Sequence, residues 1–278
     1  IVPVISLALM IITSRIFLEP GESPTVTFTL IMTLLVLMPF CIISGFLFIR
    51  LVKIAGVNNY LTPGRSYSIE TAGGIIAGVL LTFLANGILN NYQIFLLLLL
   101  INLSYFLLTF KLVSGKTRVL AGILTASCAF LILLTNPDKI FRQILLPVIN
   151  VNNTIDTPYG NITQADYANE GCIYYNHRLQ SYTYDISEKE ESIHYALLQV
   201  KNPENIILIS GNLKSLNSEL QKYKLKQVIY LERDPVLSDL MKDTLVNVGS
   251  TKILIKNLDA YSYFRKKREK TNAVIMLL

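Results

Sequence analysis

One stretch of 31 residues, Asn205 to Pro235, indicates the fold of this chain; it reads NIILISGNLKSLNSELQKYKLKQVIYLERDP. Its first part, Ile206 to Ile209, is a short run of β-branched apolar residues, and turn-forming residues follow it. Leu213 to Tyr223 then carries apolar residues at helical spacing, and Val228 to Leu231 is a second apolar run. The order strand, turn, helix and strand predicts a βαβ unit of a parallel sheet.

The turn and the acid of this unit predict a ligand. The first turn of a βαβ unit lets a ligand approach the N–H groups at the helix start, and an acid after the second strand can bind the two hydroxyls of a ribose. Here the turn contains Gly211 and the acid is Glu232, which favours a nucleoside-like ligand. The turn has a single glycine, however, and we expect Leu213 and Lys214 to occupy space that the ligand needs.

Composition divides the chain into an apolar half and an ordinary half. Only seven of the 25 Lys and Arg residues and three of the 19 Asp and Glu residues precede residue 138. The net charge of +6 therefore belongs mostly to loops beside apolar segments, and nucleic-acid binding has little support. Cys41, Cys128 and Cys172 are scattered, so we expect small buried side chains and neither a disulfide framework nor a metal site.

Apolar segments before residue 138 predict membrane-spanning helices. A helix of about 20 apolar residues crosses the hydrocarbon core of a bilayer, which is about 30 Å thick. Ile1 to Phe17 is interrupted by Pro3 and Arg15, and it is interpreted as the end of a span. Four further segments are long enough, or nearly so, to predict complete spans: Thr27 to Ile49, Ile69 to Leu89, Gln93 to Phe110 and Val119 to Leu134.

Polar residues in these segments leave alternatives open. Glu70 either lies at a helix N-terminus at the membrane interface or lines a polar cavity. Gly74 and Gly78 form a G-x-x-x-G pattern, which favours close packing of two helices over a gap for a substrate. Asn86 and Asn102 are interpreted as hydrogen-bond partners between helices.

Basic residues in the loops give conflicting signals about orientation. The loops Arg50 to Arg65 and Lys111 to Arg118 each carry three basic residues, and the positive-inside rule places them in the cytoplasm. An odd number of crossings then places the second half of the chain outside. Lys139 and Arg142 follow the last span and favour the opposite side, so the sidedness stays open.

The remaining sequence predicts two smaller domains. From Asp156, the stretch DTPYGNITQADYANEGCIYYNHRLQSYTYD contains turn signals between short apolar runs, and it predicts a β-meander. We expect a transmembrane region over 1–137, a connector over 138–153, a small β-domain over 154–186 and a Rossmann-like α/β domain over 187–278. Because the chain lacks an initial Met and ends within an apolar strand, NAVIMLL, we expect a fragment at both ends or a trimmed chain, with the last domain incomplete.

Several motifs, taken in order, resemble the spermidine synthases, which are polyamine aminopropyltransferases. The motifs are TPYGNIT, YNHRLQSYTYD, SIHYALL, IILISGNLKSLNSEL, VIYLERDP and LDAYSYF; the earlier GRSYSIETAGGIIAG resembles the multi-spanning membrane part of fused relatives. The resemblance implies a multi-span helical membrane region, a small β-meander and an incomplete Rossmann-like domain of the methyltransferase type. It also implies a protein of a bacterial inner membrane and a homodimer formed through the soluble domain.

The resemblance further implies a reaction in polyamine biosynthesis. Decarboxylated S-adenosylmethionine serves as co-substrate and donates an aminopropyl group to putrescine, with neither a metal nor a permanently bound cofactor. Residue by residue, Gln180 matches a glutamine near the co-substrate, and His194 matches the histidine of a Tyr-His-Glu helix. Gly211 lies in the glycine turn, Glu232 matches the ribose-binding acid and Asp259 matches the acid beside the adenine. On plainer interpretations, His194 is a packed residue of an amphipathic helix and Asp259 is a helix cap.

Departures from the family pattern concern the catalytic base. Leu277 occupies the position of the aspartate that deprotonates the attacking amine, and a leucine cannot accept a proton. His194 is then the strongest candidate for a base, and Asp185 is a weaker one. Glu219 matches the glutamate that ends the helix after the glycine turn.

The sequence therefore supports two hypotheses of different classes. One is a membrane-bound aminopropyltransferase-like enzyme. The other is a membrane protein whose synthase-like domain has lost its chemistry and serves as a binding, regulatory or transport-associated module. The missing glycines and Leu277 favour the second hypothesis.

Overall fold

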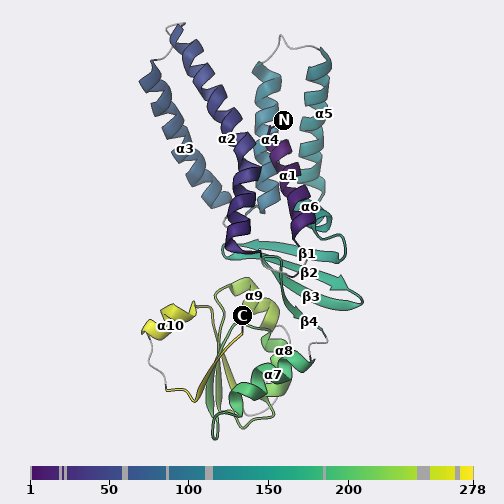
Figure 1. Cartoon of the computed structure of the whole chain (residues 1–278), viewed down its shortest axis with the longest axis vertical. Helices are drawn as coiled ribbons and strands as arrows, with labels where there is room; N and C mark the ends of the chain where they lie inside the picture. The colour runs from purple at the N-terminus through teal and green to yellow at the C-terminus, as the bar shows by residue number, and fades with distance from the viewer. Residues whose placement is uncertain are drawn as a thin grey trace. The chain divides into compact units, whose positions relative to one another are not determined.

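The structure is a computed structural model that describes residues 2–18, 21, 24–57, 62–85, 88–109, 115–183, 186–242, 251–266 and 270–277. The chain divides into two compact units, Ile1–Asp156 and Thr157–Leu278. The first unit is mainly helical, and the second contains most of the β-structure together with shorter helices (Figure 1).

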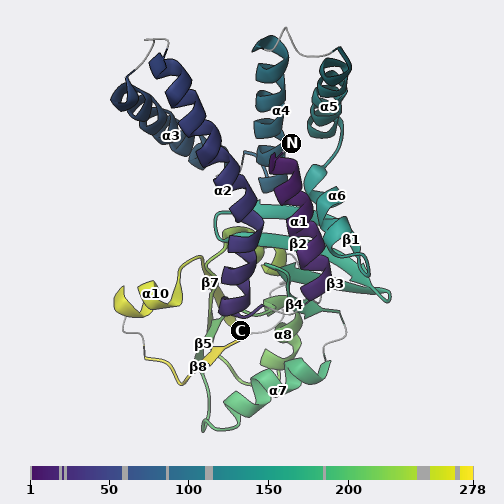
Figure 2. The ribbon, with the colours of Figure 1, turned by 45° about the horizontal axis from the view of Figure 1, so that its top comes forward.

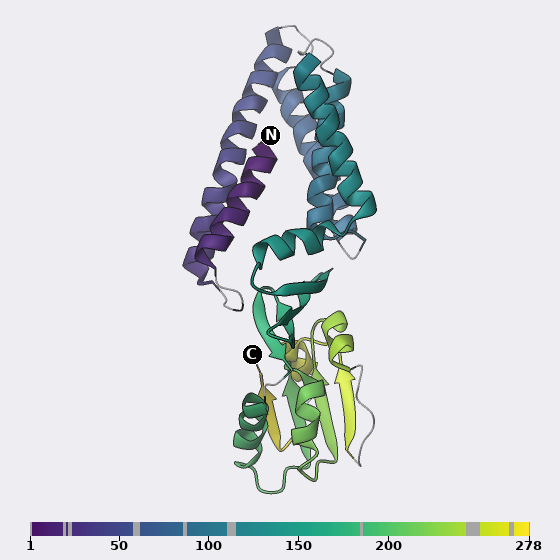
Figure 3. The same ribbon diagram turned by 90° about the vertical axis from the view of Figure 1, so that its right-hand side faces the viewer.

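The first unit contains six helices among its described residues. They are α1 (Val2–Phe17), α2 (Val26–Val57), α3 (Pro63–Ala85), α4 (Asn91–Thr109), α5 (Gly115–Leu134) and α6 (Pro137–Leu145). Helices α4 and α5 lie side by side (Figure 2 and Figure 3). By length and composition, α2 to α5 are apolar enough to cross a membrane, whereas the apolar part of α1 is shorter.

The polar features of α3 and α4 differ from the expected packing. A Cβ added to Gly74 or Gly78 would meet no described atom within 4 Å, so the close helix contact predicted for this pair is not seen in the described part of the chain. The Asn102 side chain donates to the Leu98 carbonyl of its own helix, at 2.8 Å, rather than to a neighbouring helix. Glu70 lies inside α3 and is exposed. Asn86 lies outside the described residues.

The segment expected to be a connector is ordered by a charged cluster. It contains α6 and the start of β1 (Asn150–Thr157). The Asp138 carboxylate accepts from the Tyr92 N–H at 3.2 Å, and Asp156 accepts from the Asn91 N–H at 2.9 Å. Arg142 lies 3.5 Å from Asp156. Both carboxylates therefore bind N–H groups at the N-terminus of α4, where the helix dipole favours negative charge.

The predicted meander is present and begins with β1. The sheet has the order β1-β2-β3-β4, with β2 (Gly160–Tyr167), β3 (Glu170–Tyr175) and β4 (Arg178–Tyr182) joined as antiparallel hairpins. Each hairpin turns over two residues with positive φ, Ala168-Asn169 and Asn176-His177. Such turns match the right-handed twist of the strands they join.

The stretch that predicted a βαβ unit forms one. It consists of β5 (Asn205–Ile209), α8 (Leu213–Leu220) and β6 (Gln227–Leu231), and the two strands pair in parallel. The second sheet also contains β7 (Lys252–Lys256) and β8 (Ala273–Met276), in the order β7-β6-β5-β8. All pairs in this sheet are parallel, so α/β topology of the Rossmann-like kind is present in the second unit.

Helices cover both faces of this parallel sheet (Figure 1). Helix α7 (Ile186–Leu197) and helix α8 pack on one face, where Ile193, Leu213 and Leu208 are fully buried. On the other face, Tyr263 of α10 (Ala260–Lys266) packs against the alternate residues of β5 and β6. Helix α9 (Pro235–Lys242) packs through Leu237 and Met241 against Ile162 of the meander. Burial of each large apolar side chain contributes about 1.5–3 kcal/mol before entropy is counted.

Candidate functional site

The turn between β5 and α8 has an unusual backbone. Ser210 and Gly211 both have positive φ, 58° and 83°. Positive φ is ordinary for glycine, but it costs about 1–2 kcal/mol for a residue with a Cβ. Asn212 then caps α8, since its side chain accepts from the Ser215 N–H at 3.3 Å. The turn therefore ends β5 abruptly and starts the helix within three residues.

The prediction that Leu213 occupies the ligand space of this turn is wrong. Its side chain is fully buried in the core between α7, α8 and the sheet. Lys214 is exposed and does not line the pocket beside the turn. The residue that approaches Gly211 is Leu277, whose Cδ1 atom would lie 2.6 Å from a Cβ at position 211.

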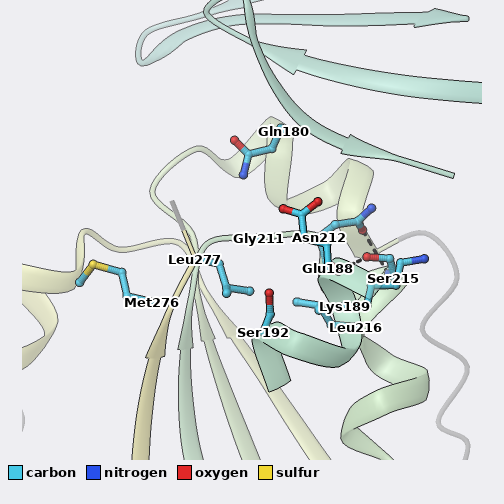
Figure 4. A pocket seen from close by; sticks show the side chains of 10 residues that line it. All are labelled: Gln180, Glu188, Lys189, Ser192, Gly211, Asn212, Ser215, Leu216, Met276 and Leu277. Carbon is cyan, nitrogen blue, oxygen red and sulfur yellow. Dashed lines mark hydrogen bonds between the residues drawn. The ribbon is translucent and has the colours of Figure 1, made fainter. Parts of the chain in front are cut away.

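A pocket of about 180 Å³ lies beside this turn, at the carboxyl ends of β5 and β8 (Figure 4). In the order β7-β6-β5-β8, the sheet extends from β5 in both directions, and such a switch point is where open α/β sheets bind ligands. The lining residues come from β4, α7, the turn, α8 and the end of β8: Gln180, Glu188, Lys189, Ser192, Gly211, Asn212, Ser215, Leu216, Met276 and Leu277.

The pocket brings together two of the residues predicted to bind the co-substrate, the Leu277 that replaces the expected base, and several residues that the sequence did not indicate. Gln180 and Gly211 both line it, although 30 residues separate them. Glu188 and Ser192 of α7 had no pattern that marked them, because they are ordinary polar residues of an amphipathic helix. Figure 4 shows Gln180 above the turn and Ser192 on the opposite side of the pocket. The lining thus combines these polar side chains with the apolar residues Leu216 and Leu277.

His194 does not line this pocket and has partners between α7 and α8. Its Nε2 lies 2.9 Å from a carboxylate oxygen of Glu219, and its Nδ1 lies 2.7 Å from the Tyr223 hydroxyl. Glu219 also pairs with Lys222. The hydrogen bond from Lys222 and that from His194 outweigh desolvation, so the pKa of Glu219 is lowered. In this arrangement His194 joins two helices, and both ring nitrogens are occupied.

Glu232 follows β6 and is buried, but it also lies outside the pocket lining. One of its carboxylate oxygens accepts from the Asp234 N–H at 3.2 Å. Asp234 is buried as well and accepts from the Thr157 hydroxyl and from the Val236 N–H. Asp234 was not singled out in the sequence, although an aspartate before Pro235 at a helix start is a recognisable cap.

The two acids after β6 affect a tyrosine of the meander. Burial raises the pKa of Tyr175 to about 12, and the nearby charges of Asp234 and Glu232 act in the same direction. The phenol therefore stays protonated near neutral pH. Nearby, the Arg233 guanidinium lies over the Tyr159 ring, 4.7 Å from its centroid, which is a favourable cation–π distance.

Asp259 has the position of a helix cap. Its carboxylate accepts from the Ser262 N–H at 3.1 Å, at the start of α10, and its side chain is exposed. It does not line the pocket. Asp185, the weaker candidate for a base, lies outside the described residues. Among the residues that the structure does describe, no cluster of three His, Cys, Asp or Glu side chains could hold a metal ion.

The second unit is thus a parallel α/β domain with a pocket at its switch point. No model of a known protein family matches the sequence. The chain is 25% identical to a polyamine aminopropyltransferase of Oceanobacillus iheyensis, in an alignment of 249 residues that covers 82% of this chain and 48% of the relative. It is 28% identical over 130 residues to a polyamine aminopropyltransferase of Sulfurisphaera tokodaii, covering 43% of each chain.

Solved structures similar to part of the chain include a spermidine synthase from Thermotoga maritima. Its TM-score is 0.40 at 15% identity, and the match covers 46% of this chain and 47% of that one. A spermidine synthase in complex with the transition-state analogue AdoDATO has the same TM-score and identity, with coverage of 46% of each chain. The sequence matches relate this chain to the spermidine synthases, and it spans about half the length of the curated relatives it matches.

Proposed function

We propose that this chain belongs to a membrane-bound protein of the spermidine synthase type, with a site for a nucleoside-containing aminopropyl donor at the Gly211 turn. The pocket at the carboxyl ends of β5 and β8 carries this proposal, because it lies at the switch point of a parallel sheet. The activity of the relatives would be aminopropyl transfer from decarboxylated S-adenosylmethionine to putrescine.

The residues that line the pocket determine which ligand groups it can bind. Gln180, Ser192 and Asn212 supply donors and acceptors, and Glu188 supplies a carboxylate that suits an ammonium group. Glu232 is buried beside Asp234 and does not line the pocket, so it binds a ribose only if the sugar extends from the pocket beyond the Gly211 turn. Pockets that hold drug-sized ligands commonly measure about 300–1,000 Å³. A pocket of about 180 Å³ is small for a whole adenosyl group.

We further propose that transfer is weak or lost in this chain. Leu277 stands at the position aligned with the proton-accepting aspartate, and it packs against the Gly211 turn. General-base catalysis contributes roughly 10²- to 10⁴-fold to rates. His194 offers little compensation, because Glu219 and Tyr223 occupy both nitrogens.

The second candidate function is a binding or regulatory module without catalysis. The position of Leu277 favours it, because this side chain covers the glycine backbone that a ligand would approach while polar pocket residues are retained. On this hypothesis the domain retains a small-molecule site and senses or positions a ligand for the membrane part of the protein.

Membrane insertion is proposed from the helices of the first unit. Four of them are long and apolar enough to cross a bilayer, and their large apolar side chains are exposed in the structure. The second unit makes up less than half of the chain, so the 82% coverage by the Oceanobacillus relative extends well into this helical unit. The basic loops leave the side of the second unit open.

The test is an assay of the full chain in membranes. Parent protein, Leu277→Asp and His194→Ala are incubated with decarboxylated S-adenosylmethionine and putrescine, and spermidine is followed by mass. We expect no turnover above background in the parent and a gain in Leu277→Asp, with Leu277→Asn as the matched control that cannot accept a proton. Turnover in the parent that His194→Ala abolishes would refute the inactive form of the proposal and identify the base.

A further inference from the structure

Tyr230 occupies an unexpected position for a polar side chain. It lies near the end of β6, a strand with a partner on each side, and it is fully buried in the core formed with α7 and α8. Its hydroxyl donates to the Gly211 carbonyl at 2.8 Å. Desolvation, with a smaller contribution from Glu232, raises the pKa of Tyr230, so this hydroxyl remains a donor at physiological pH. The hydrogen bond thus links the core of the sheet to the ligand-side turn.

The turn needs such a link because its backbone is strained. Ser210 has φ of 58° although it carries a Cβ, and this conformation persists only where the surroundings hold it. Within the turn, the Gly211 carbonyl accepts from the Leu213 N–H at 3.1 Å. Two further hydrogen bonds hold the turn to the sheet: the Ser210 N–H donates to the Leu231 carbonyl at 2.9 Å, and the Tyr230 hydroxyl donates to the same Gly211 carbonyl. Both come from β6, so this strand defines the path of the turn.

The direction of the Gly211 carbonyl decides what the turn presents to the pocket. A peptide unit is planar and trans, so its C=O and the following N–H point in opposite directions. Since the Gly211 carbonyl points at Tyr230 in the core, the Asn212 N–H points away from the core. In the described part of the chain, no carbonyl or side chain accepts from this N–H. Gly211 and Asn212 both line the pocket.

We propose that Tyr230 is a positioning residue, which sets the Gly211–Asn212 peptide so that its N–H is available to an acceptor atom of a ligand. A phenylalanine would fill the same space in the core but would leave the Gly211 carbonyl with only its local donor, the Leu213 N–H, and without a tie to β6. The peptide could then rotate, and the pocket would lose an oriented donor without losing any side chain that lines it. Ligand affinity is the part of the inference that rests on the proposed function.

The test compares Tyr230→Phe with a matched control in the full chain, purified in detergent. Tyr263→Phe removes another buried hydroxyl, from the other face of the same sheet, where it lies 3.5 Å from Lys256 Nζ. Amide hydrogen exchange is measured for residues 210–213 and for β5 and β6. We expect Tyr230→Phe to raise exchange in the turn about tenfold and to leave the two strands unchanged. The control should leave the turn unchanged.

Binding of methylthioadenosine by calorimetry gives a second readout. We expect Tyr230→Phe to weaken binding about fivefold, the loss of one hydrogen bond, while Tyr263→Phe keeps the parent affinity. If the parent itself does not bind this probe, the nucleoside site of the proposed function fails, and the exchange data still decide the role of Tyr230. Turn exchange equal to that of the parent, or raised equally in β5, β6 and the turn, would overturn the inference.

Discussion

Leu277 Cδ1 would lie 2.6 Å from a Cβ at residue 211, so the glycine and the leucine are fitted to one another. The Leu277 N–H also donates to the Ile209 carbonyl at 3.0 Å, which continues the pairing of β8 with β5 one residue past the end of β8. Leu277, which the sequence resemblance aligns with a catalytic aspartate, is therefore held against the one glycine of the turn. This relationship affects both stability and the shape of the pocket.

The pair can be tested by a double-mutant cycle. Gly211→Ala should reduce the free energy of unfolding by about 2 kcal/mol, because alanine is strained at positive φ and its Cβ meets Leu277. Leu277→Ala alone should cost about 1 kcal/mol of lost burial. In the double variant the clash is gone, so the total should be smaller than the sum of the two, as measured by denaturant unfolding in detergent. Strict additivity would contradict the contact.

Asp138 should make stability depend on pH. Desolvation, partly offset by the Tyr92 N–H, raises the pKa of Asp138 from 3.8 to about 6. The folded chain therefore holds this proton more tightly than the unfolded chain, and its contribution to stability falls as pH rises from 3.8 to about 6. The change is on the order of 2–3 kcal/mol. Asp138→Asn should lack this fall and should be more stable than the parent at pH 7.

Thermal unfolding of both forms from pH 4 to pH 8 gives this comparison. Lys139→Gln is the matched control, because it changes the charge of the exposed neighbouring residue on the same helix. We expect its curve to run parallel to that of the parent. An Asp138→Asn curve that is also parallel to the parent would mean that the buried carboxyl titrates normally.

Glu219 should have the opposite pH dependence. Its pKa is lowered by the hydrogen bonds from Lys222 and His194, so the stability it provides is present above its ordinary value of 4.5 and is lost as pH falls below it. Glu219→Gln should remove this acid-side loss and should cost about 1 kcal/mol at pH 7. Glu190→Gln is the control, since Glu190 also pairs with Lys222, at the longer distance of 3.7 Å, and its side chain is exposed. If the parent and Glu219→Gln lose stability equally as pH falls below 4.5, the interactions of Glu219 with Lys222 and His194 do not stabilise the fold.

Cys41 reports whether α2 crosses a membrane. It lies near the middle of this helix and its side chain is exposed, whereas Cys128 and Cys172 are buried. In a variant with Cys128→Ser and Cys172→Ser, we expect Cys41 to resist a membrane-impermeant maleimide in native membranes and to react after solubilisation and unfolding. Tyr159→Cys, at an exposed turn of the second unit, is the reactive control once membranes are opened. Rapid labelling of Cys41 in intact membranes would contradict insertion of α2.

Local periodicity in the sequence was enough to predict the main elements of both halves. The apolar runs before residue 138 form long helices, and the stretch from Asn205 forms strand, helix and strand almost as expected. Such patterns indicate which residues are buried away from water. Buried residues recur once per turn in a helix and every second residue in a strand, so they are visible in short stretches of sequence. The ordered motifs also indicated the relationship to the spermidine synthases, which the sequence matches support.

The tertiary structure decided where the side chains of the turn point and which residues share a pocket. Leu213 was expected beside the ligand but lies in the core, because the positive φ values of Ser210 and Gly211 rotate the start of α8. The meander brings Gln180 to the pocket beside the turn, and the pairing of β8 with β5 brings Leu277 there. His194 of α7 is held by Glu219 of α8. These contacts join residues far apart in the chain, so only the folded strand order and turn geometry determine them.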